Sequence, residues 1–158
     1  MTGMPALSIR PIATADIQLC ARMMERSEPW ITLGRGYESG LAMLNDASRE
    51  RHAAVLGDQV AGFVVLLMQG ALVGYLQTIC VAPERRGSGV GRALMDYAED
   101  LVFARYANLF LMVSDFNAPA QRFYAQLGYE QVGVLRDYLV AGRSEILMRK
   151  TRGPIRRT

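Results

Sequence analysis

The sequence is poor in the residues that form disulfides and metal sites. Its 158 residues include two cysteines, Cys20 and Cys80, and one histidine, His52. Two distant cysteines provide neither a disulfide framework nor the paired spacing of a thiolate metal site, and a single histidine argues against a histidine-based metal site. We therefore expect no metal and a reducing location, the cytoplasm. Cys80 is expected to be a packed apolar residue and not a nucleophile.

Long apolar runs and a basic body are also missing. The longest apolar run covers residues 63–68, far short of the roughly 20 residues that span a bilayer, and the N-terminus has no signal-peptide pattern. The last ten positions hold five basic residues and no acid, so the remainder has thirteen basic and fifteen acidic residues, a net charge of −2, although the whole chain carries +3. Bulk charge therefore favours neither a membrane nor a nucleic acid as partner.

What the chain does contain is the composition of a folded domain. Hydrophobic residues make up 51% and charged residues 21% of the sequence, and a chain of this length is expected to form one domain with a core of its own. We place that domain at residues 1–150 and a basic C-terminal tail at residues 151–158. The tail is expected to be a solvated chain end.

Hydrophobic periodicity predicts strands mixed with helices. Strands are expected at residues 7–11, 53–56, 59–68, 72–81, 108–113, 129–135 and 144–149, and helices at residues 15–26, 37–44, 90–104 and 118–127. Thr14 is expected to cap the first helix and Asn117 the last. This order indicates an α/β fold built on one sheet.

A glycine-rich turn follows the strand expected at residues 72–81. The segment from Arg86 to Arg92 reads RGSGVGR and leads into a helix. Glycines allow close approach and positive φ, and the first amides of a helix lack internal partners, so such a turn can hold a phosphate. A Walker loop is excluded because the only lysine is Lys150. A dinucleotide fingerprint is excluded because Arg92 stands where its third glycine is required.

Two motifs resemble those of the GNAT N-acetyltransferase superfamily. The first is Arg86-x-x-Gly89-x-Gly91 directly after a strand, and the second is Asn117-x-x-Ala120-x-x-Phe123-Tyr124-x-x-x-Gly128-Tyr129. Strong similarity covers about residues 77–132, whereas residues 10–50, where that family diversifies for its substrate, match only in outline. The resemblance implies an α/β fold with a single mixed, mostly antiparallel sheet of about seven strands flanked by about four helices. It also implies acetyl-CoA as co-substrate.

The resemblance further implies roles for individual residues. Backbone groups of Ile79 and Val81 would pair with the pantetheine arm of acetyl-CoA, and Asn117 would lie near that arm. Tyr124 would be the general acid that protonates the departing thiolate. The pyrophosphate would be held at the glycine turn, by Arg86, Gly87, Gly89, Val90, Gly91 and Arg92.

The general base is a departure from the family pattern. Many members carry a glutamate on the strand before the glycine turn, where this chain has Gln77, and an amide accepts no proton at neutral pH. Glu28, Asp115, or Tyr75 through a chain of water molecules are alternatives. A further alternative is a substrate that arrives already deprotonated.

The acceptor is expected to be a small amine or a protein amine. Its selection should depend on residues 27–44 and on the turn at residues 137–142, and the candidate contacts are Glu28, Trp30, Tyr37, Tyr75 and Gln77. Trp30 could equally anchor a loop in the core. Two functions follow: acetyl transfer to a primary amine in a ternary complex, or a non-catalytic acyl-CoA-binding or sensing module. Gln77 argues for the second and Tyr124 against it. Many members of the family form homodimers, and no signature in this sequence decides that point.

Overall fold

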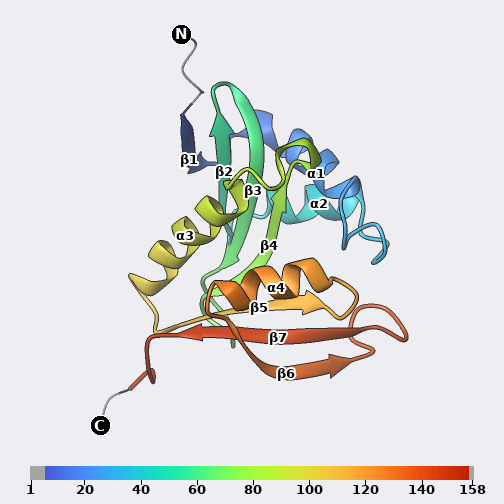
Figure 1. Ribbon diagram of the computed structural model, residues 1–158. Coiled ribbons are helices and arrows are strands. Elements are labelled where there is room, and N and C mark those ends of the chain that lie inside the picture. The colour runs from blue at the N-terminus through green and yellow to red at the C-terminus, as the bar shows by residue number, and fades with distance from the viewer. Residues whose placement is uncertain (1–5, 157–158) are drawn as a thin grey trace. The chain divides into compact units, whose positions relative to one another are not determined.

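Figure 1 shows the computed structural model of the protein, which describes residues 6–156. The strands of this part of the chain pair into one sheet in the order β1-β2-β3-β4-β5-β7-β6. The mixed, mostly antiparallel sheet and its helices confirm the fold class expected from the sequence. The strands are β1 Leu7–Pro11, β2 Glu50–Leu56, β3 Gln59–Leu67, β4 Tyr75–Val81, β5 Asn108–Ser114, β6 Glu130–Arg136 and β7 Ser144–Thr151, and the helices are α1 Ile17–Glu25, α2 Tyr37–Asn45, α3 Val90–Phe103 and α4 Ala118–Gln126.

The chain forms two compact units, and each is described by itself. The described part of the first unit is residues 6–66 and 78–98, and that of the second is residues 67–77 and 99–156. β4 and α3 therefore contribute residues to both units. The glycine turn belongs to the first unit, and the motif that begins at Asn117 belongs to the second.

The first unit combines an antiparallel meander with two short helices. β2 pairs with β1 on one side and β3 on the other, with His52 opposite Val64 in the second ladder. α1 and α2 are nine residues each, too short to be stable in isolation, so the burial of their apolar faces holds them in place. The buried cluster is Ile17, Cys20, Ala21, Met23, Met24, Met43, Leu44, Phe63, Val65, Cys80 and Ala82.

The second unit depends on strand pairing between distant parts of the chain. β4 pairs in parallel with β5 at Tyr75 and Phe110, and β7 lies between β5 and β6, antiparallel to both (Figure 1). The hairpin expected from the last two strands is confirmed. Side chains alternate along β5, because the buried positions lie on one face and the half-buried positions on the other; the buried ones are Leu109, Leu111 and Val113.

The expected start of the fourth strand is wrong by three residues. β4 begins at Tyr75 and not at residue 72, because Gly74 takes a φ of +75°, which lies outside the extended range of a strand. Glycine is required here for space as well as for φ. A Cβ at this position would lie 2.6 Å from the Asn108 carbonyl oxygen and 2.7 Å from Val102 Cγ1.

One of the two expected helix caps is also wrong. Thr14 does not cap α1 but starts a short 3₁₀ turn, Thr14–Asp16. There the Asp16 carboxylate accepts a hydrogen bond from the Ala13 amide at 2.8 Å. The Asn117 cap of α4 is confirmed, because its side chain accepts a hydrogen bond from the Ala120 amide at 3.3 Å.

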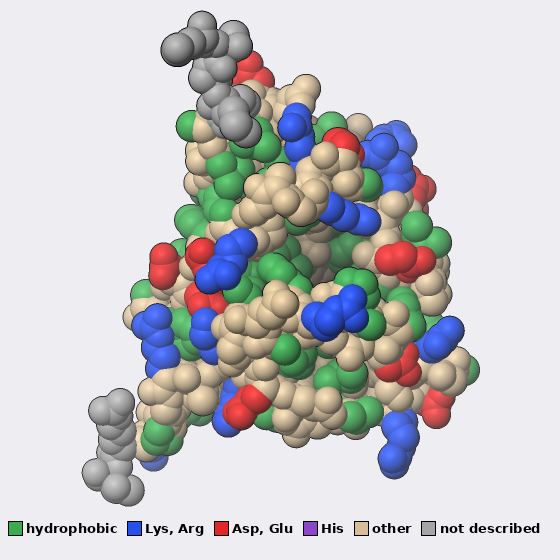
Figure 2. All heavy atoms as spheres, in the orientation of Figure 1, with side chains coloured by type: hydrophobic (Ala, Val, Ile, Leu, Met, Phe, Trp, Pro, Cys, Tyr) green, Lys and Arg blue, Asp and Glu red, His purple; other side chains and the backbone are tan. Residues whose placement is uncertain are grey.

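Surface charge agrees with the near-neutral body. Figure 2 shows basic and acidic side chains interspersed over one face of the molecule. None of the helices within residues 6–156 is long and apolar enough to cross a membrane. β7 ends at Thr151, which is the first residue of the expected basic tail. The last two residues of that tail, Arg157 and Thr158, lie outside the described residues.

Candidate active site

The glycine turn joins the end of β4 to α3 in the first unit. Gly87 and Gly89 have φ values of +72° and +87°, and a Cβ at either position would meet no atom within 4 Å. Backbone conformation, and not lack of space, therefore selects glycine here. The bare backbone is left open to a ligand.

The amides after this turn are those at the start of a helix. The first bond of the α3 ladder runs from the Ala93 amide to the Gly89 carbonyl at 3.0 Å. The amides of Val90, Gly91 and Arg92 precede that bond, so the helix itself supplies them with no acceptor. They lie at the positive end of the dipole of a 14-residue helix. This part of the predicted phosphate site has the local geometry that the sequence suggested.

Three arginines in or beside the turn have different surroundings. Arg85 Nη2 donates a hydrogen bond to Gln59 Oε1 at 3.2 Å. Arg92 pairs with Asp96 over 3.5 Å, with both side chains more than 60% exposed, so that pair is weak. Arg86 is exposed and makes no ion pair with another residue of the described chain. Arg86 is therefore the cation most available to a phosphate.

The end of β4 carries the expected alternation. Ile79 and Val81 are half-buried, while Thr78 and Cys80 between them are buried. The Cys80 side chain is 3% exposed, and burial raises the pKa of its thiol to about 11. A thiol in this state is neutral and unreactive at physiological pH, which confirms Cys80 as a packed residue. The pairing of Ile79 and Val81 with pantetheine stays a prediction.

Tyr124 lies on α4 in the second unit and is 6% exposed. Its ring contacts those of Phe123 and Tyr129, at centroid distances of 5.3 and 5.9 Å. Burial, and to a smaller degree the nearby Tyr75, raises the pKa of Tyr124 well above its usual range. The hydroxyl is hydrogen-bonded to none of the described residues. Tyr124 therefore holds a proton at any physiological pH, and no acceptor within residues 6–156 engages that proton.

The end of β5 positions Asn117 and one member of a buried, hydrogen-bonded pair, Ser114 of β5 and Glu145 of β7. The Asn117 amide donates to the Ser114 carbonyl at 3.0 Å, and the Ser114 hydroxyl donates to Glu145 Oε1 at 2.7 Å. Ser114 and Glu145 are 2% and 4% exposed. Burial raises the pKa of the Glu145 carboxyl, and the bond from Ser114 offsets part of that rise.

Glu145 was not singled out from the sequence. The only local signal is an acid within the apolar pattern of the last strand, and such acids are commonly exposed. Only the pairing of β7 with β5 shows that this position faces inward. Glu145 is therefore the titratable residue of this region that sequence reasoning missed.

The candidate acceptor contacts fall into both units. In the first unit, the Glu28 carboxylate accepts hydrogen bonds from the Thr32 amide and hydroxyl at 3.2 and 3.0 Å. Trp30 and Tyr37 pack against the buried cluster, which supports the role of Trp30 as a loop anchor. The second unit holds Tyr75 and Gln77. Residues 6–156 contain no group of three or more side chains that could hold a metal ion.

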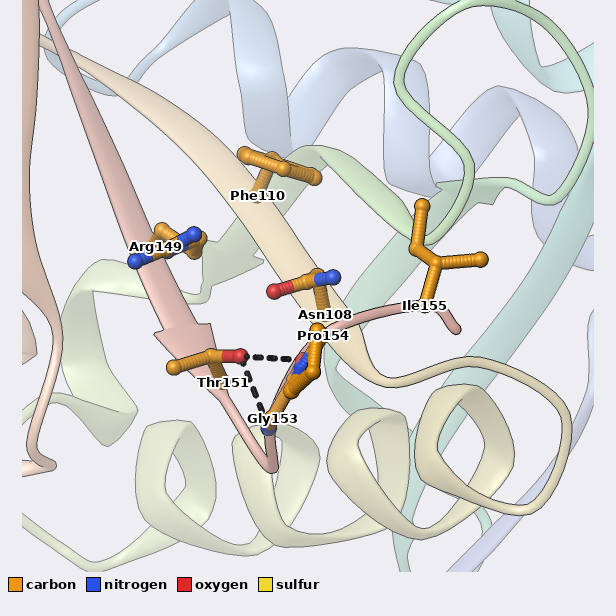
Figure 3. Close-up of a pocket in the computed structure, with 7 residues that line it drawn as sticks. All are labelled: Asn108, Phe110, Arg149, Thr151, Gly153, Pro154 and Ile155. Atoms are coloured by element: carbon orange, nitrogen blue, oxygen red, sulfur yellow. Dashed lines mark hydrogen bonds between the residues drawn. The ribbon is translucent and has the colours of Figure 1, made fainter. Parts of the chain in front are cut away.

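A separate pocket of about 520 Å³ lies in the second unit. Two enclosed atoms in its wall, Asn108 Oδ1 and Arg149 Nε, have no hydrogen-bond partner. Thr151 Oγ1 is bonded there to both the amide and the carbonyl of Gly153, at 3.1 Å each. None of the predicted site residues lines this pocket. Figure 3 shows its lining, which is Asn108, Phe110, Arg149, Thr151, Gly153, Pro154 and Ile155.

Similarity to known proteins extends over most of the chain. The N-alpha-acetyltransferase RimI of Mycobacterium tuberculosis is 29% identical over 157 residues, which cover 93% of this chain and 94% of that protein. Streptothricin acetyltransferase of Streptomyces lavendulae is 42% identical over 60 residues, which cover 37% of this chain and only 32% of that protein.

Solved structures share the fold. A crystal structure from Desulfovibrio desulfuricans that is assigned to the GNAT family has a TM-score of 0.78 and 25% identity, and the match covers 92% of this chain and 99% of that one. An aminoglycoside 6'-N-acetyltransferase complexed with coenzyme A has a TM-score of 0.70 and 22% identity, over 95% and 99% of the two chains. A sequence model of the acetyltransferase (GNAT) family matches residues 15–129. With the glycine turn and the Asn117 motif in their expected elements, this match shows that the chain belongs to the acetyltransferase (GNAT) family.

Proposed function

We propose that the protein transfers the acetyl group of acetyl-CoA to a primary amine, by direct attack of the amine within a ternary complex. The observation that carries this proposal is the turn after β4, where glycines of positive φ lead into α3 and the first amides of that helix precede its first internal hydrogen bond. Such an array at the positive end of a helix dipole suits a pyrophosphate. Membership of the acetyltransferase family supports acetyl-CoA as the molecule that carries it.

The coenzyme would be bound by local groups and not by bulk charge. The amides of Gly87, Gly89, Val90, Gly91 and Arg92 would hold the pyrophosphate, and Arg86, which is free of ion pairs within the described chain, would add a charge-assisted contact. The backbone of Ile79 and Val81 would extend the sheet with the pantetheine arm. Asn117, already the cap of α4, would lie beside that arm.

The chemistry needs one proton removed from the acceptor and one delivered to the leaving group. The nitrogen lone pair of a neutral amine attacks the thioester carbonyl, and a backbone amide near Ile79 would stabilise the negative charge on the oxygen. The C–S bond then breaks, and the thiolate takes a proton from Tyr124. The raised pKa of Tyr124 keeps that proton available, and the same enclosure that raises it also makes a thiolate more basic.

The names of the relatives indicate which classes of acceptor amine to test. One relative is named for α-amine acetylation and another for the antibiotic streptothricin. Peptide α-amines are the acceptors to test first, because the match to the α-amine enzyme covers nearly the whole chain. Relatives named as acetyltransferases also favour turnover over a non-catalytic acyl-CoA-binding module.

A thiol-release assay tests the proposed function. Acetyl-CoA is offered with peptides of different N-terminal residues, streptothricin, aminoglycosides and polyamines, and free coenzyme A is measured over time. Release that depends on one class of amine is expected. Tight binding of coenzyme A without release on any amine would contradict the transfer reaction and favour the binding module.

A matched pair of variants tests the phosphate site. Arg86→Gln should raise the Kd for coenzyme A, and the loss should shrink at high salt because it is electrostatic. Arg85→Gln is the control, because Arg85 is the preceding residue and is engaged by Gln59. Equal losses in both variants would show that the turn does not use Arg86 specifically.

Residues 1–150 are proposed to act as one acetyltransferase domain, with the basic tail at 151–158 outside it. The cytoplasm is its proposed location, because Cys20 and Cys80 are unpaired and free thiols persist in reducing compartments.

A further inference from the structure

Transfer to an amine that arrives protonated requires a base, and Gln77 cannot take a proton. We propose that Glu145 is the general base that removes a proton from the ammonium group of the acceptor. This inference rests on the proposed acetyl transfer and adds the residue that prepares the nucleophile.

The position of Glu145 is set by two ladders of the second unit. On β7 it lies directly opposite Ser114 of β5 and Leu135 of β6. The Ser114 hydroxyl donates to Glu145 Oε1 at 2.7 Å, and both side chains are at most 4% exposed. The Ser114 carbonyl in turn accepts from the amide of Asn117. Glu145 is therefore linked through one residue to the second acetyltransferase motif.

Strand register places Glu145 on the sheet face that carries Gln77. Residues directly opposite in a ladder, and residues two apart on a strand, point to the same face. Glu145 lies opposite Ser114, which shares a face of β5 with Phe110 because the two are four residues apart. Phe110 lies opposite Tyr75, and Tyr75 shares a face of β4 with Gln77, two residues later. Gln77 stands where many family members carry the base, so this chain offers a carboxylate on that face from another strand.

Glu145 also adjoins the turn that is expected to select the acceptor. Residues 137–142 form that turn, which is closed by a hydrogen bond from the Gly142 amide to Asp137 Oδ1 at 2.6 Å. β7 begins two residues later, at Ser144. An acid at the second position of β7 is therefore placed next to the turn that is expected to select the acceptor.

The charged groups around Glu145 leave it without a cation. Asp115 follows Ser114 on β5, accepts a hydrogen bond from the Ser144 amide, and raises the pKa of the Glu145 carboxyl further. Arg143 stacks over the Phe116 ring at 5.3 Å, and Arg136 of β6 is exposed opposite Ser144. Neither arginine pairs with Glu145 among the described residues. A buried carboxylate without a cation is unfavourable for the fold, which is typical of a functional acid.

Two of the other candidate bases, Glu28 and Asp115, are engaged elsewhere. Glu28 accepts two hydrogen bonds from Thr32, and the Asp115 carboxylate is exposed and holds the Ser144 amide. Glu145 has Ser114 as its single hydrogen-bond partner in the described chain. Its second carboxylate oxygen is therefore free to take a proton.

The proton balance of the complete reaction is then closed. Glu145 takes one proton from R–NH₃⁺ to give R–NH₂, whose lone pair forms the C–N bond as the C–S bond breaks. The thiolate takes a proton from Tyr124, and the phenolate regains one from the nitrogen, which loses its second proton on becoming an amide. Glu145 releases its proton to water, so one H⁺ is released per acetyl group transferred.

The test compares Glu145→Gln with Glu130→Gln, a matched change at an exposed glutamate of the neighbouring strand β6. With the best amine from the thiol-release panel, kcat/KM of Glu145→Gln at pH 7 should fall by about 10²–10⁴, the range of general base catalysis. This loss in kcat/KM should shrink about tenfold for each unit by which the pH rises toward the pKa of the amine. The reason is that hydroxide then supplies the free amine without the enzyme's base. Glu130→Gln should keep the wild-type profile.

Two further readouts separate a base from a structural residue. Glu145→Gln keeps an acceptor for the Ser114 hydroxyl, so its Tm should be no lower than that of the wild type, and its Kd for coenzyme A should be unchanged. Ser114→Ala removes the bond that lowers the pKa of the carboxyl, so the acidic limb of kcat/KM should move to higher pH. This second variant decides the question if Glu145→Gln does not fold.

The outcomes distinguish this inference from the proposed function. An active wild type with Glu145→Gln within threefold of it at pH 6–7, or an unmoved acidic limb in Ser114→Ala, would overturn the role of Glu145 alone. A wild type that binds coenzyme A and releases no thiol on any amine would overturn the transfer reaction and the base together.

Discussion

The exchange of tyrosine for phenylalanine at two neighbouring positions should separate catalysis from stability. Tyr124 and Tyr129 are both buried and their rings are in contact. The Tyr124 hydroxyl has no hydrogen-bond partner in the described chain, so Tyr124→Phe breaks no protein hydrogen bond. Its free energy of unfolding should change by less than about 0.5 kcal/mol. Loss of the general acid should lower kcat by about 10²–10⁴, or about 3–5 kcal/mol of transition-state stabilisation.

Tyr129→Phe should have the opposite pattern. The Tyr129 hydroxyl donates to Glu99 Oε1 at 3.1 Å, while Lys150 Nζ binds the other oxygen of Glu99 at 2.7 Å. A hydrogen bond to a charged group contributes about 1.5–3 kcal/mol. We expect the lower end of this energy range, because Lys150 keeps Glu99 paired in the variant. A loss of about 1.5 kcal/mol corresponds to a fall in Tm of about 3–6 °C for a chain of this size. Activity per folded molecule should stay at the wild-type level.

Urea unfolding and the thiol-release assay, run on both variants, measure the two effects. A change in the urea midpoint at constant slope reports stability. The reasoning is refuted if Tyr124→Phe keeps full activity, or if the two variants lose stability and activity in the same proportion. The raised pKa of Tyr124 adds a check, because the wild-type pH profile should show no alkaline limb from this residue below about pH 10.

Three further predictions concern the fold and the phosphate site. Gly74→Ala should destabilise the protein by about 2–4 kcal/mol more than Gly70→Ala, because both positions have positive φ but only the first lacks space for a Cβ; equal urea midpoints would contradict this. Gly89→Ala should raise the Kd for coenzyme A, since its φ of +87° disfavours any side chain; calorimetric titration measures the change. The bond from Arg10 lowers the pKa of Asp16, so Asp16→Asn should lower Tm at pH 7. In thermal melts from pH 7 to 2, the difference in Tm between wild type and variant should close as pH falls below about 4.

Much of the fold follows from local signals. The Asn117 cap, the glycine turn and the alternation of β4 each depend on residues within one turn or strand, and all three are found where the sequence predicts them. Thr14 was misassigned because Asp16, two residues later, provides the competing acceptor for the turn. The start of β4 was misplaced because Gly74 is held by a close approach to Asn108, 34 residues away.

The sequence by itself determined the family motifs, because each is a short pattern in a defined element, and the predictions of acetyl-CoA as coenzyme and of Tyr124 as general acid depend on those motifs. The tertiary structure alone decided that β7 is placed between β5 and β6, so that Glu145 meets Ser114 across 31 residues of chain. It also decided that the Tyr124 hydroxyl has no hydrogen-bond partner among residues 6–156, while the Tyr129 hydroxyl is bonded to Glu99. Burial and pairing of this kind depend on the register of distant strands, which local periodicity does not encode.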